Sequence, residues 1–168
     1  MSMEEKQNSQ TSLDFNQNIF KPTSREEIVE IVKTCYRKNI PLEINGLKSK
    51  NKIGRNFQSE KTLDLSDFKG IIDYKPEELY IKVKAGTPLK EIIEELDKNN
   101  QQLAFEPNDF GYLFSGESNS GSIGGVVSCN FAGSRRFKVG SVRDHILGFQ
   151  GINGCLLYTS DAADDGIR

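Results

Sequence analysis

Apolar side chains recur every three to four residues after Ser24, which predicts an amphipathic helix that ends at about Lys38. Its apolar face holds Ile28, Ile31, Val32, Cys35 and Tyr36. Ser24 and Glu27 have the spacing of a capping box, in which each side chain accepts a hydrogen bond from a backbone N–H of the first turn. The start of this helix is therefore specified locally, by residues that are close together in the sequence.

A second helix is predicted after residue 87, with Leu89, Ile92, Ile93 and Leu96 on its apolar face. Thr87 is the expected N-cap and Pro88 the expected first helical residue, where the missing N–H of proline costs nothing. Short apolar runs predict strands over residues 40–44, 61–65, 70–74 and 102–105. The alternation of Leu79, Ile81, Val83 and Ala85 with polar or aromatic residues predicts a half-buried strand. This succession of strands and helices predicts a first α/β subdomain over residues 19–106.

Residues 107–154 differ in composition, because ten of the 15 glycines lie between Gly111 and Gly154. Such a density disfavours long helices and indicates a backbone shaped around a bound group. A Gly/Ser linker has a similar composition over residues 115–122, but it would lack the apolar residues that follow. We therefore expect residues 107–154 to begin a second subdomain, with a short helix after Gly125 and a strand over residues 146–153.

The two ends of the chain look different from the rest. The polar segment 1–18 is expected to be a disordered leader, because it has neither the basic start nor the apolar run of a signal peptide. Residues 155–168, CLLYTSDAADDGIR, resemble the translation of a sequencing adapter, and we expect them to be a non-native, disordered tail after a truncated domain; the alternative is a natural acidic tail. The tail holds three Asp and one Arg, which account for the whole net charge of −2.

Composition excludes several classes of function. A neutral body has no positive field for nucleic acid, and no apolar run is long enough to span a membrane. His145 is the only His in the sequence, so a multi-histidine metal site is excluded and a Ser-His-Asp triad could form only with this residue. We expect His145 to be structural. The three Cys have neither metal-ligand nor CxxC spacing, which indicates reduced thiols and a cytoplasmic protein. We expect Cys35 to be a small core residue.

Two loops have the chemistry of an anion site. In Ser122-Ile123-Gly124-Gly125, paired glycines let backbone N–H groups approach an anion without interference from a Cβ atom. In Asn45-Gly46-Leu47-Lys48-Ser49-Lys50, a strand ends in a glycine, followed by exposed N–H groups, a hydroxyl and two cations. The alternatives are a tight structural turn and a solvated basic turn. The patterns GxGxxG and the P-loop are both absent.

A third basic segment, Gly133-Ser134-Arg135-Arg136-Phe137-Lys138, is more simply explained by exposed cations. Taken together, the motifs resemble the FAD-binding domain of the vanillyl-alcohol oxidase and p-cresol methylhydroxylase superfamily. Within it, the resemblance is to the smaller flavin subunits of bacterial glycolate oxidases. The residues that carry it are Gly46 to Lys50, Ala85 to Leu89, Glu106-Pro107, Gly124 to Val127, Ala132 to Arg136 and Gly140 to Gly148.

The resemblance implies an α+β fold of two subdomains with FAD between them, incomplete at its C-terminus. It places the pyrophosphate on the loop Asn45, Gly46, Leu47, Lys48, Ser49, Lys50, with Ser122, Ile123, Gly124 and Gly125 closing on it. It places Pro107, Ser128, Asn130 and Gly133 along the flavin and ribityl chain, and Ile152 at the adenine end. Because the loop 45–50 contains no His, FAD is expected to be non-covalent. The connection between Gly111 and Gly124 is longer than usual in the family, which affects the placement of Pro107.

The implied reaction is the oxidation of a 2-hydroxy acid, glycolate before D-lactate-type acids, with transfer of electrons to flavin. The implied partners are a second flavin subunit and an iron–sulfur subunit, which would place the protein peripherally at the inner membrane. In this superfamily the catalytic bases come from a cap domain, so no catalytic residue is expected here and the fragment itself is expected to be inactive. The alternatives are a non-catalytic subunit that binds FAD to relay electrons or to complete a complex, and a plain nucleotide- or anion-binding module.

Overall fold

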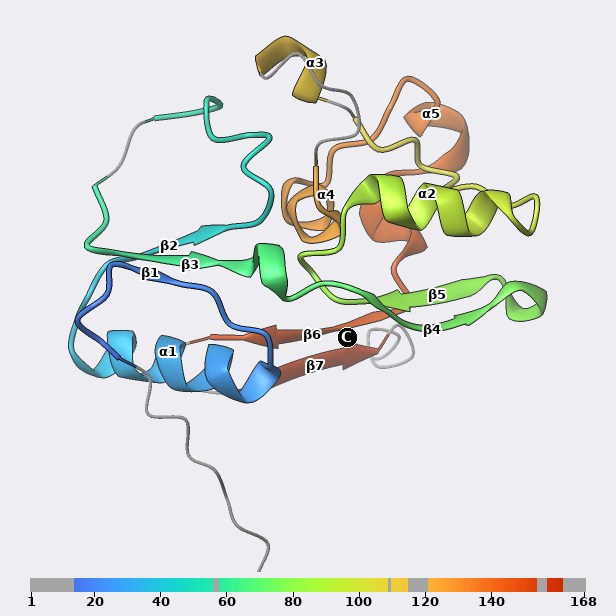
Figure 1. Ribbon diagram of the computed structural model, residues 1–168. Coiled ribbons are helices and arrows are strands. Elements are labelled where there is room, and N and C mark those ends of the chain that lie inside the picture. Colours follow the sequence, from blue (N-terminus) through green and yellow to red (C-terminus); the bar gives the residue numbers. More distant parts are fainter. Residues whose placement is uncertain (1–13, 56–57, 109, 115–120, 154–156, 162–168) are drawn as a thin grey trace, which may run out of the picture.

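The computed structural model describes residues 14–55, 58–108, 110–114, 121–153 and 157–161. Its first layer is a parallel sheet in the order β1–β3–β2, made of β1 (Ile19–Phe20), β2 (Leu42–Asn45) and β3 (Lys61–Asp64). Helix α1 (Arg25–Arg37) connects β1 to β2 and packs on the sheet, as Figure 1 shows. The α/β arrangement predicted for the first part of the chain is confirmed.

Helix α1 begins as its sequence predicts. The Ser24 hydroxyl accepts a hydrogen bond from the Glu27 N–H at 3.3 Å, and the Glu27 carboxylate accepts one from the Ser24 N–H at 3.3 Å. Its apolar face, with Ile28, Ile31 and Cys35, forms the first core together with Phe20 and Leu63 of the sheet. Burial raises the pKa of the Cys35 thiol, and the nearby Lys61 and Lys38 only partly offset this, so Cys35 is a small core residue as expected.

Residues 14–18 belong to the folded part, although the sequence placed them in a disordered leader. The Phe15 ring packs on Phe20 with 5.2 Å between centroids. The Lys61 ammonium donates to the carbonyl oxygens of Phe15 and Gln17 at 3.2 and 2.9 Å. The apolar Phe15 and the carbonyl groups before β1 thus find partners on the sheet, a long-range effect invisible in the local composition.

The middle of the chain forms an antiparallel pair, β4 (Ile71–Lys75) and β5 (Tyr80–Val83), followed by α2 (Leu89–Asp97). Short 3-10 helices, η1 (Leu65–Asp67) and η2 (Pro76–Glu78), flank β4. The prediction that Thr87 caps α2 is wrong, since the N-cap is Pro88 and no side chain caps it. The buried Thr87 hydroxyl instead donates to the Lys84 carbonyl at 2.6 Å and accepts from the Gly70 N–H at 3.0 Å. It ties the start of β4 to the end of β5.

A second core lies between α2 and the glycine-rich part of the chain. Its buried residues are Leu89, Phe105, Val126 and Val142. The strand predicted over residues 102–105 is absent: Phe105 turns its ring into this core, and Glu106 has a positive φ of 47°, so the chain turns instead of extending. Just after this segment, Pro107 makes an isolated strand-like bridge with Ala132. This part also contains α3 (Gly111–Phe114), α4 (Ile123–Cys129), α5 (Arg136–Val139) and η3 (Val142–His145).

The last described element is an antiparallel pair, β6 (Gly148–Ile152) with β7 (Leu157–Asp161). The strand predicted over residues 146–153 is confirmed over its central part. The expectation that residues 155–168 carry no order is wrong for residues 157–161, which pair with all five residues of β6. The backbone groups of a strand edge are satisfied by any extended segment that follows, so this pairing does not test the origin of the tail, which stays a prediction.

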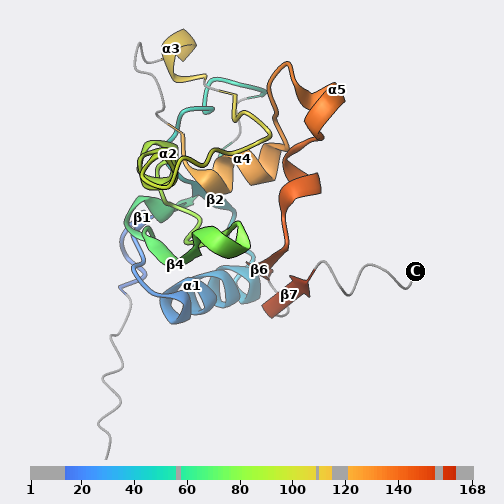
Figure 2. The same cartoon turned by 90° about the vertical axis from the view of Figure 1, so that its right-hand side faces the viewer.

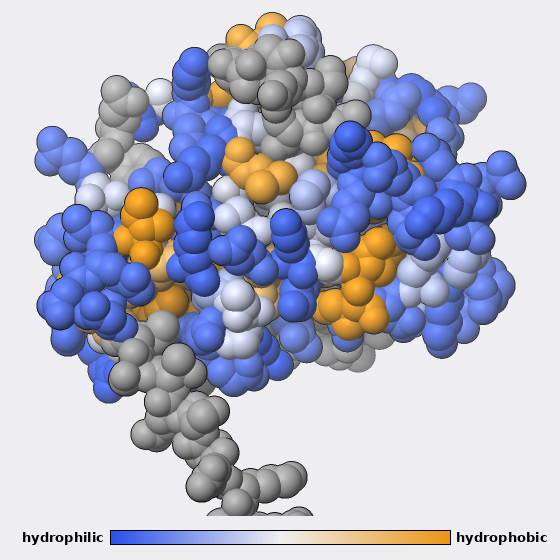
Figure 3. Space-filling model, viewed as in Figure 1, coloured by the Kyte–Doolittle hydropathy of each residue, from blue (hydrophilic) through white to orange (hydrophobic). Residues whose placement is uncertain are grey.

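The elements form layers around the strands. In Figures 1 and 2, α1 lies on one side of the strands and α2 and α4 lie on the other. The face seen in Figure 3 is mostly hydrophilic, with small separate apolar areas. None of the helices in the described part of the chain is long and apolar enough to cross a membrane.

Candidate functional site

The two glycine-containing loops singled out in the sequence meet in space. A cavity of about 270 Å³ lies between the loop after β2 and the first turn of α4. It is lined by Ile44, Asn45, Gly46, Leu47, Lys48, Ser49, Lys50, Asn51, Leu65, Ala85, Ser122, Gly124, Gly125, Ser128 and Cys129. All six predicted residues of the first loop and four from the α4 region, including Ser128, therefore share one cavity.

Backbone hydrogen bonds bring the second loop to this place. Segment 121–124 runs along segment 85–89, with Leu89 N–H donating to Gly121 C=O at 2.9 Å and Ile123 N–H donating to Thr87 C=O at 3.0 Å. A bridge between Pro88 and Ser122 belongs to the same contact. The start of α4 is thus fixed on the loop before α2, opposite the end of β2.

Three glycines at the cavity have different surroundings. A Cβ atom on Gly46 would overlap the Ser122 hydroxyl, and one on Gly124 would lie 2.7 Å from the Ala85 carbonyl oxygen. These two glycines are needed for the loops to approach one another. A Cβ atom on Gly125 would meet only Ser122 Oγ at 3.4 Å and Lys50 Nζ at 3.7 Å, which are ordinary contacts. Gly125 is therefore dispensable for packing, and its missing side chain leaves space inside the cavity.

The loop after β2 presents backbone donors. In the part of the chain that the structure describes, no acceptor is bonded to the N–H groups of the four successive residues Leu47, Lys48, Ser49 and Lys50. Lys48 has a positive φ of 58°, and the turn closes through the Asn51 N–H, which donates to Lys48 C=O at 3.3 Å. Successive N–H groups around a left-handed residue form a concave donor surface suited to an anion.

The two loop lysines have different partners. Lys48 Nζ lies 3.9 Å from the carboxylate of Asp64, whose side chain is only 9% exposed. Burial raises the pKa of this carboxyl, but hydrogen bonds from Ser66 and the charges of Lys48 and Lys21 outweigh it, and the pKa lies below its usual range. Lys48 therefore compensates a buried negative charge of the fold.

Lys50 has no carboxylate partner among the described residues. Its Nζ lies 3.6 Å from a Cβ position on Gly121, just before the second loop, and 3.7 Å from one on Gly125 within it. It also lies 6.0 Å from the centre of the Phe110 ring. Lys50 is thus the cation of the cavity, within reach of a negatively charged ligand held by both loops.

A second group of predicted residues lies beyond the C-terminal end of α4. Asn130 ends this helix in a left-handed conformation, and its Oδ1 accepts from the Arg143 N–H at 3.0 Å. Gly133 donates to the Glu106 carbonyl at 2.8 Å, beside Pro107. These contacts bring Pro107, Asn130 and Gly133 together, although none of the three lines the cavity.

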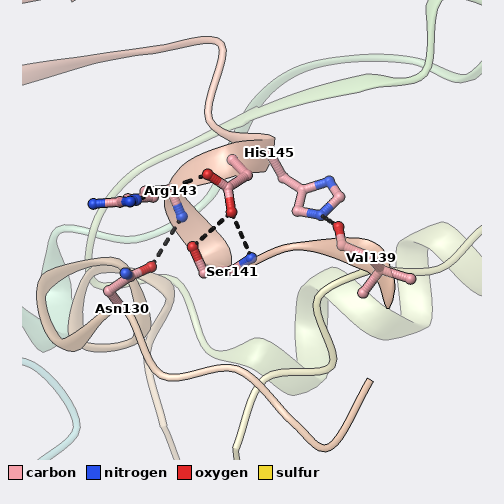
Figure 4. A network of polar contacts seen from close by, with 6 residues as sticks. Asn130, Val139, Ser141, Arg143 and His145 are labelled. Carbon is pink, nitrogen blue, oxygen red and sulfur yellow. Dashed lines mark hydrogen bonds and ion pairs between the residues drawn. The ribbon is translucent and has the colours of Figure 1, made fainter. Parts of the chain in front are cut away.

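A polar network includes Asn130 of this second group. In Figure 4, Asn130 reaches Arg143 and His145 faces the Val139 carbonyl. The Asp144 carboxylate accepts from both the N–H and the hydroxyl of Ser141. Hydrogen bonds from Ser141 lower the pKa of Asp144. The His145 ring also lies 5.6 Å from the Phe105 ring. These contacts agree with the structural role expected for His145.

The other predicted positions lie elsewhere. Ile123 packs against the second core, and Ile152 in β6 packs against the first core with α1. In the basic segment 133–138, Arg135 pairs with Glu106 at 3.5 Å and the Phe137 side chain is fully exposed. No group of three His, Cys, Asp or Glu that could hold a metal ion occurs among the described residues.

Five lining residues were not predicted: Ile44, Asn51, Leu65, Ala85 and Cys129. Ile44 is 65% exposed at the end of a strand, where an apolar residue with period 2 would suggest burial. Ala85 and Leu65 follow strands β5 and β3, so the signal was their position directly after a strand. Ile44, Leu65 and Ala85 add apolar side chains to the lining of the cavity.

The chain is similar in sequence to known proteins. The sequence profile of a family described as FAD binding domain matches residues 17–154. The chain is 37% identical over 129 residues to the glycolate oxidase subunit GlcE of Escherichia coli (strain K12), covering 77% of this chain and 35% of that protein. It is 28% identical over 125 residues to a D-lactate dehydrogenase of Anaerostipes hadrus, covering 74% and 24%. The chain thus spans about a third and a quarter of the length of these relatives.

A solved structure supports the same fold. Alkyldihydroxyacetonephosphate synthase superposes with a TM-score of 0.69 at 18% identity, over 86% of this chain and 28% of that chain. At this identity the likeness concerns the fold alone.

Proposed function

Because the chain belongs to the family of FAD-binding domains, we propose that its cavity holds the pyrophosphate of a non-covalently bound FAD. FAD is the cofactor of this domain. The proposal rests on two surfaces that face each other across the cavity. One carries the N–H groups of residues 47–50, and the other is the open position at Gly125. The α+β fold expected from the sequence is present.

The residues at the cavity fit a diphosphate. The N–H groups of residues 47–50, which have no acceptor among the described residues, would donate to its oxygens, Ser49 adds a hydroxyl, and Lys50 supplies a positive charge near Gly125. Charge-assisted hydrogen bonds of this kind are stronger than neutral ones. Pro107, Asn130 and Gly133 would follow along the ribityl and flavin portion, and the contact of Ile152 with adenine remains a prediction.

The absence of covalent attachment is proposed from the surroundings of the cavity. The only His of the chain, His145, is not among the lining residues and is bonded to the Val139 carbonyl at 2.7 Å. After acid precipitation of the yellow protein, the flavin is expected in the supernatant. Flavin that stays in the pellet would contradict this and direct attention to Cys129, which lines the cavity.

At the level of the whole protein, we propose a FAD-linked oxidoreductase that removes a hydride from a 2-hydroxy acid, since bound flavin supplies a hydride acceptor. The relatives named for glycolate oxidase and D-lactate dehydrogenase support this class. Glycolate is the first candidate substrate and a D-lactate-type acid the second. A second flavin subunit and an iron–sulfur subunit are the proposed partners, which would hold the protein peripherally at a membrane.

Turnover with an artificial dye acceptor tests the proposed activity. The whole protein is expected to reduce the dye with glycolate or D-lactate, whereas the 168-residue chain alone is expected to be inactive. A whole protein that binds FAD but leaves it oxidised with either acid would instead support a subunit that only relays electrons. A colourless protein that still binds ADP would favour a plain nucleotide-binding module.

A further inference from the structure

An aromatic pair stands next to the cavity and has no role in the proposed diphosphate contacts. The rings of Phe110 and Phe131 lie 5.4 Å apart at an angle of 52°. Lys50, which lines the cavity, has its Nζ 6.0 Å from the centre of the Phe110 ring. The pair is therefore separated from the cavity by one side chain.

Phe131 is exposed on a fixed backbone. Phe131 is 36% exposed, although it lies between two residues that are held by backbone contacts. On one side, Asn130 is bonded to Arg143; on the other, Ala132 pairs with Pro107. An aromatic ring that cannot turn inward loses the free energy of burial unless another group covers it. Planar rings that stack on aromatic side chains provide such cover.

The position of the pair indicates which ring would cover it. Phe131 is adjacent in sequence to Asn130 and close to Gly133 and Pro107, the group proposed for the ribityl and flavin portion. Ser128 and Cys129, which line the cavity, directly precede Asn130 and Phe131 in the chain.

We propose that Phe110 and Phe131 form the platform on which the isoalloxazine ring of FAD packs, a role that rests on the proposed function of the cavity. Phe131 makes the direct contact with the ring. Phe110 supports Phe131 by its tilted contact, and Lys50 links the platform to the diphosphate subsite. Phe131 is thus a positioning residue for the flavin.

The affinity of three ligands separates the platform from the diphosphate subsite. In the purified chain, Phe131→Leu keeps an apolar side chain but removes the ring, and we expect FAD and FMN to bind about tenfold more weakly, as for the loss of one stacking contact. ADP, which lacks the isoalloxazine, should bind as it does to the unchanged chain. Phe137→Leu on α5 is the matched control, because the Phe137 side chain is fully exposed and is not among the lining residues of the cavity.

Flavin fluorescence gives a second readout that does not depend on affinity. The chain contains no Trp, so Phe131→Trp introduces a single indole. If this indole contacts the isoalloxazine, directly excited flavin emission should be strongly quenched, whereas Phe137→Trp should leave the emission unchanged. Circular dichroism of each variant checks that the fold is kept, and Phe131→Tyr should restore FAD affinity.

The outcomes are distinguishable. Equal FAD affinity of Phe131→Leu and the unchanged chain, or equal flavin emission of the two Trp variants, would overturn the platform while leaving the FAD site intact. Loss of ADP affinity in Phe131→Leu would assign the pair to adenine and also overturn it. Failure of the unchanged chain to bind FAD would overturn the proposed function itself.

Discussion

Two adjacent glycines of α4 differ in what surrounds them. A Cβ atom on Gly124 would lie 2.7 Å from the Ala85 carbonyl oxygen, while one on Gly125 meets no atom closer than 3.4 Å. We predict that Gly124→Ala lowers the free energy of unfolding by about 1–3 kcal/mol, the usual range for overpacking. Gly125→Ala is the matched control and should leave stability unchanged or slightly raised, because Ala favours a helix.

Urea denaturation followed by circular dichroism measures both variants. Equal midpoints for Gly124→Ala and Gly125→Ala would contradict the close packing of α4 on residue 85. The contrast matters for function because only Gly125 can be altered to test ligand binding without first damaging the fold.

Asp64 predicts a pH dependence of stability. Its pKa is lowered in the folded chain from the usual 3.8, so the ionised form is favoured by folding. The resulting stabilisation is complete above the unfolded pKa and is lost as the pH falls toward the lower, folded pKa. The urea midpoint should therefore decrease from about pH 5 downward, and Asp64→Asn should show a smaller decrease over the same interval.

Lys48→Ala tests the partner of this carboxylate. Without the ammonium 3.9 Å away, the pKa of Asp64 should rise and stability at pH 7 should decrease. Unchanged acid midpoints in both Asp64→Asn and Lys48→Ala would contradict the assignment of Lys48 to Asp64.

At the scale of elements, Thr87 joins β4 to β5 from a position with no exposed surface. Its hydroxyl donates to the Lys84 carbonyl at 2.6 Å and accepts from the Gly70 N–H at 3.0 Å. Thr87→Val keeps the shape but removes the acceptor of the Gly70 N–H, while the Lys84 carbonyl still accepts from the Thr87 N–H at 3.1 Å. We therefore predict a loss of about 1 kcal/mol in the free energy of unfolding, as for one hydrogen bond. Thr87→Ser, which keeps the hydroxyl, should lose less; a Val variant as stable as the original chain would contradict the role of the hydroxyl.

Comparison of α1 with residues 87 and 102–105 shows which sequence signals predict structure. Helix α1 was predicted with its cap because Ser24 and Glu27 bond within one turn. The strand over residues 102–105 and the capping role of Thr87 were wrong because both depend on distant partners: Phe105 packs with Val126 and Val142, and Thr87 bonds to Gly70. Local signals are reliable where the partners are local.

At the scale of the whole molecule, local chemistry predicted the residues of the candidate site, whereas the meeting of the two loops was predicted only through the family resemblance. Loops 45–50 and 122–125 were recognised from glycines, hydroxyls and cations, whose chemistry is local. Their meeting depends on the bonds between segments 85–89 and 121–124, which no local pattern contains. For the same reason Ala85, Leu65 and Ile44 were missed as lining residues.

The proposed FAD site is one cavity formed by these two loops. Lys48→Ala should weaken FAD binding little, because Lys48 is occupied by Asp64 and a solvated cation contributes roughly 1 kcal/mol or less. Gly125→Val should weaken it far more, because the side chain would fill the space that the ligand needs.

Equilibrium titration of the purified chain with FAD, for the original sequence and for Gly125→Val, tests whether the two loops form a pyrophosphate site. We predict that the original chain binds FAD and that Gly125→Val binds it at least about tenfold more weakly, as for the loss of one hydrogen bond to a charged group, with the same circular dichroism spectrum. Equal FAD affinity of the two proteins, or no binding by the original chain, would contradict a pyrophosphate site between these loops.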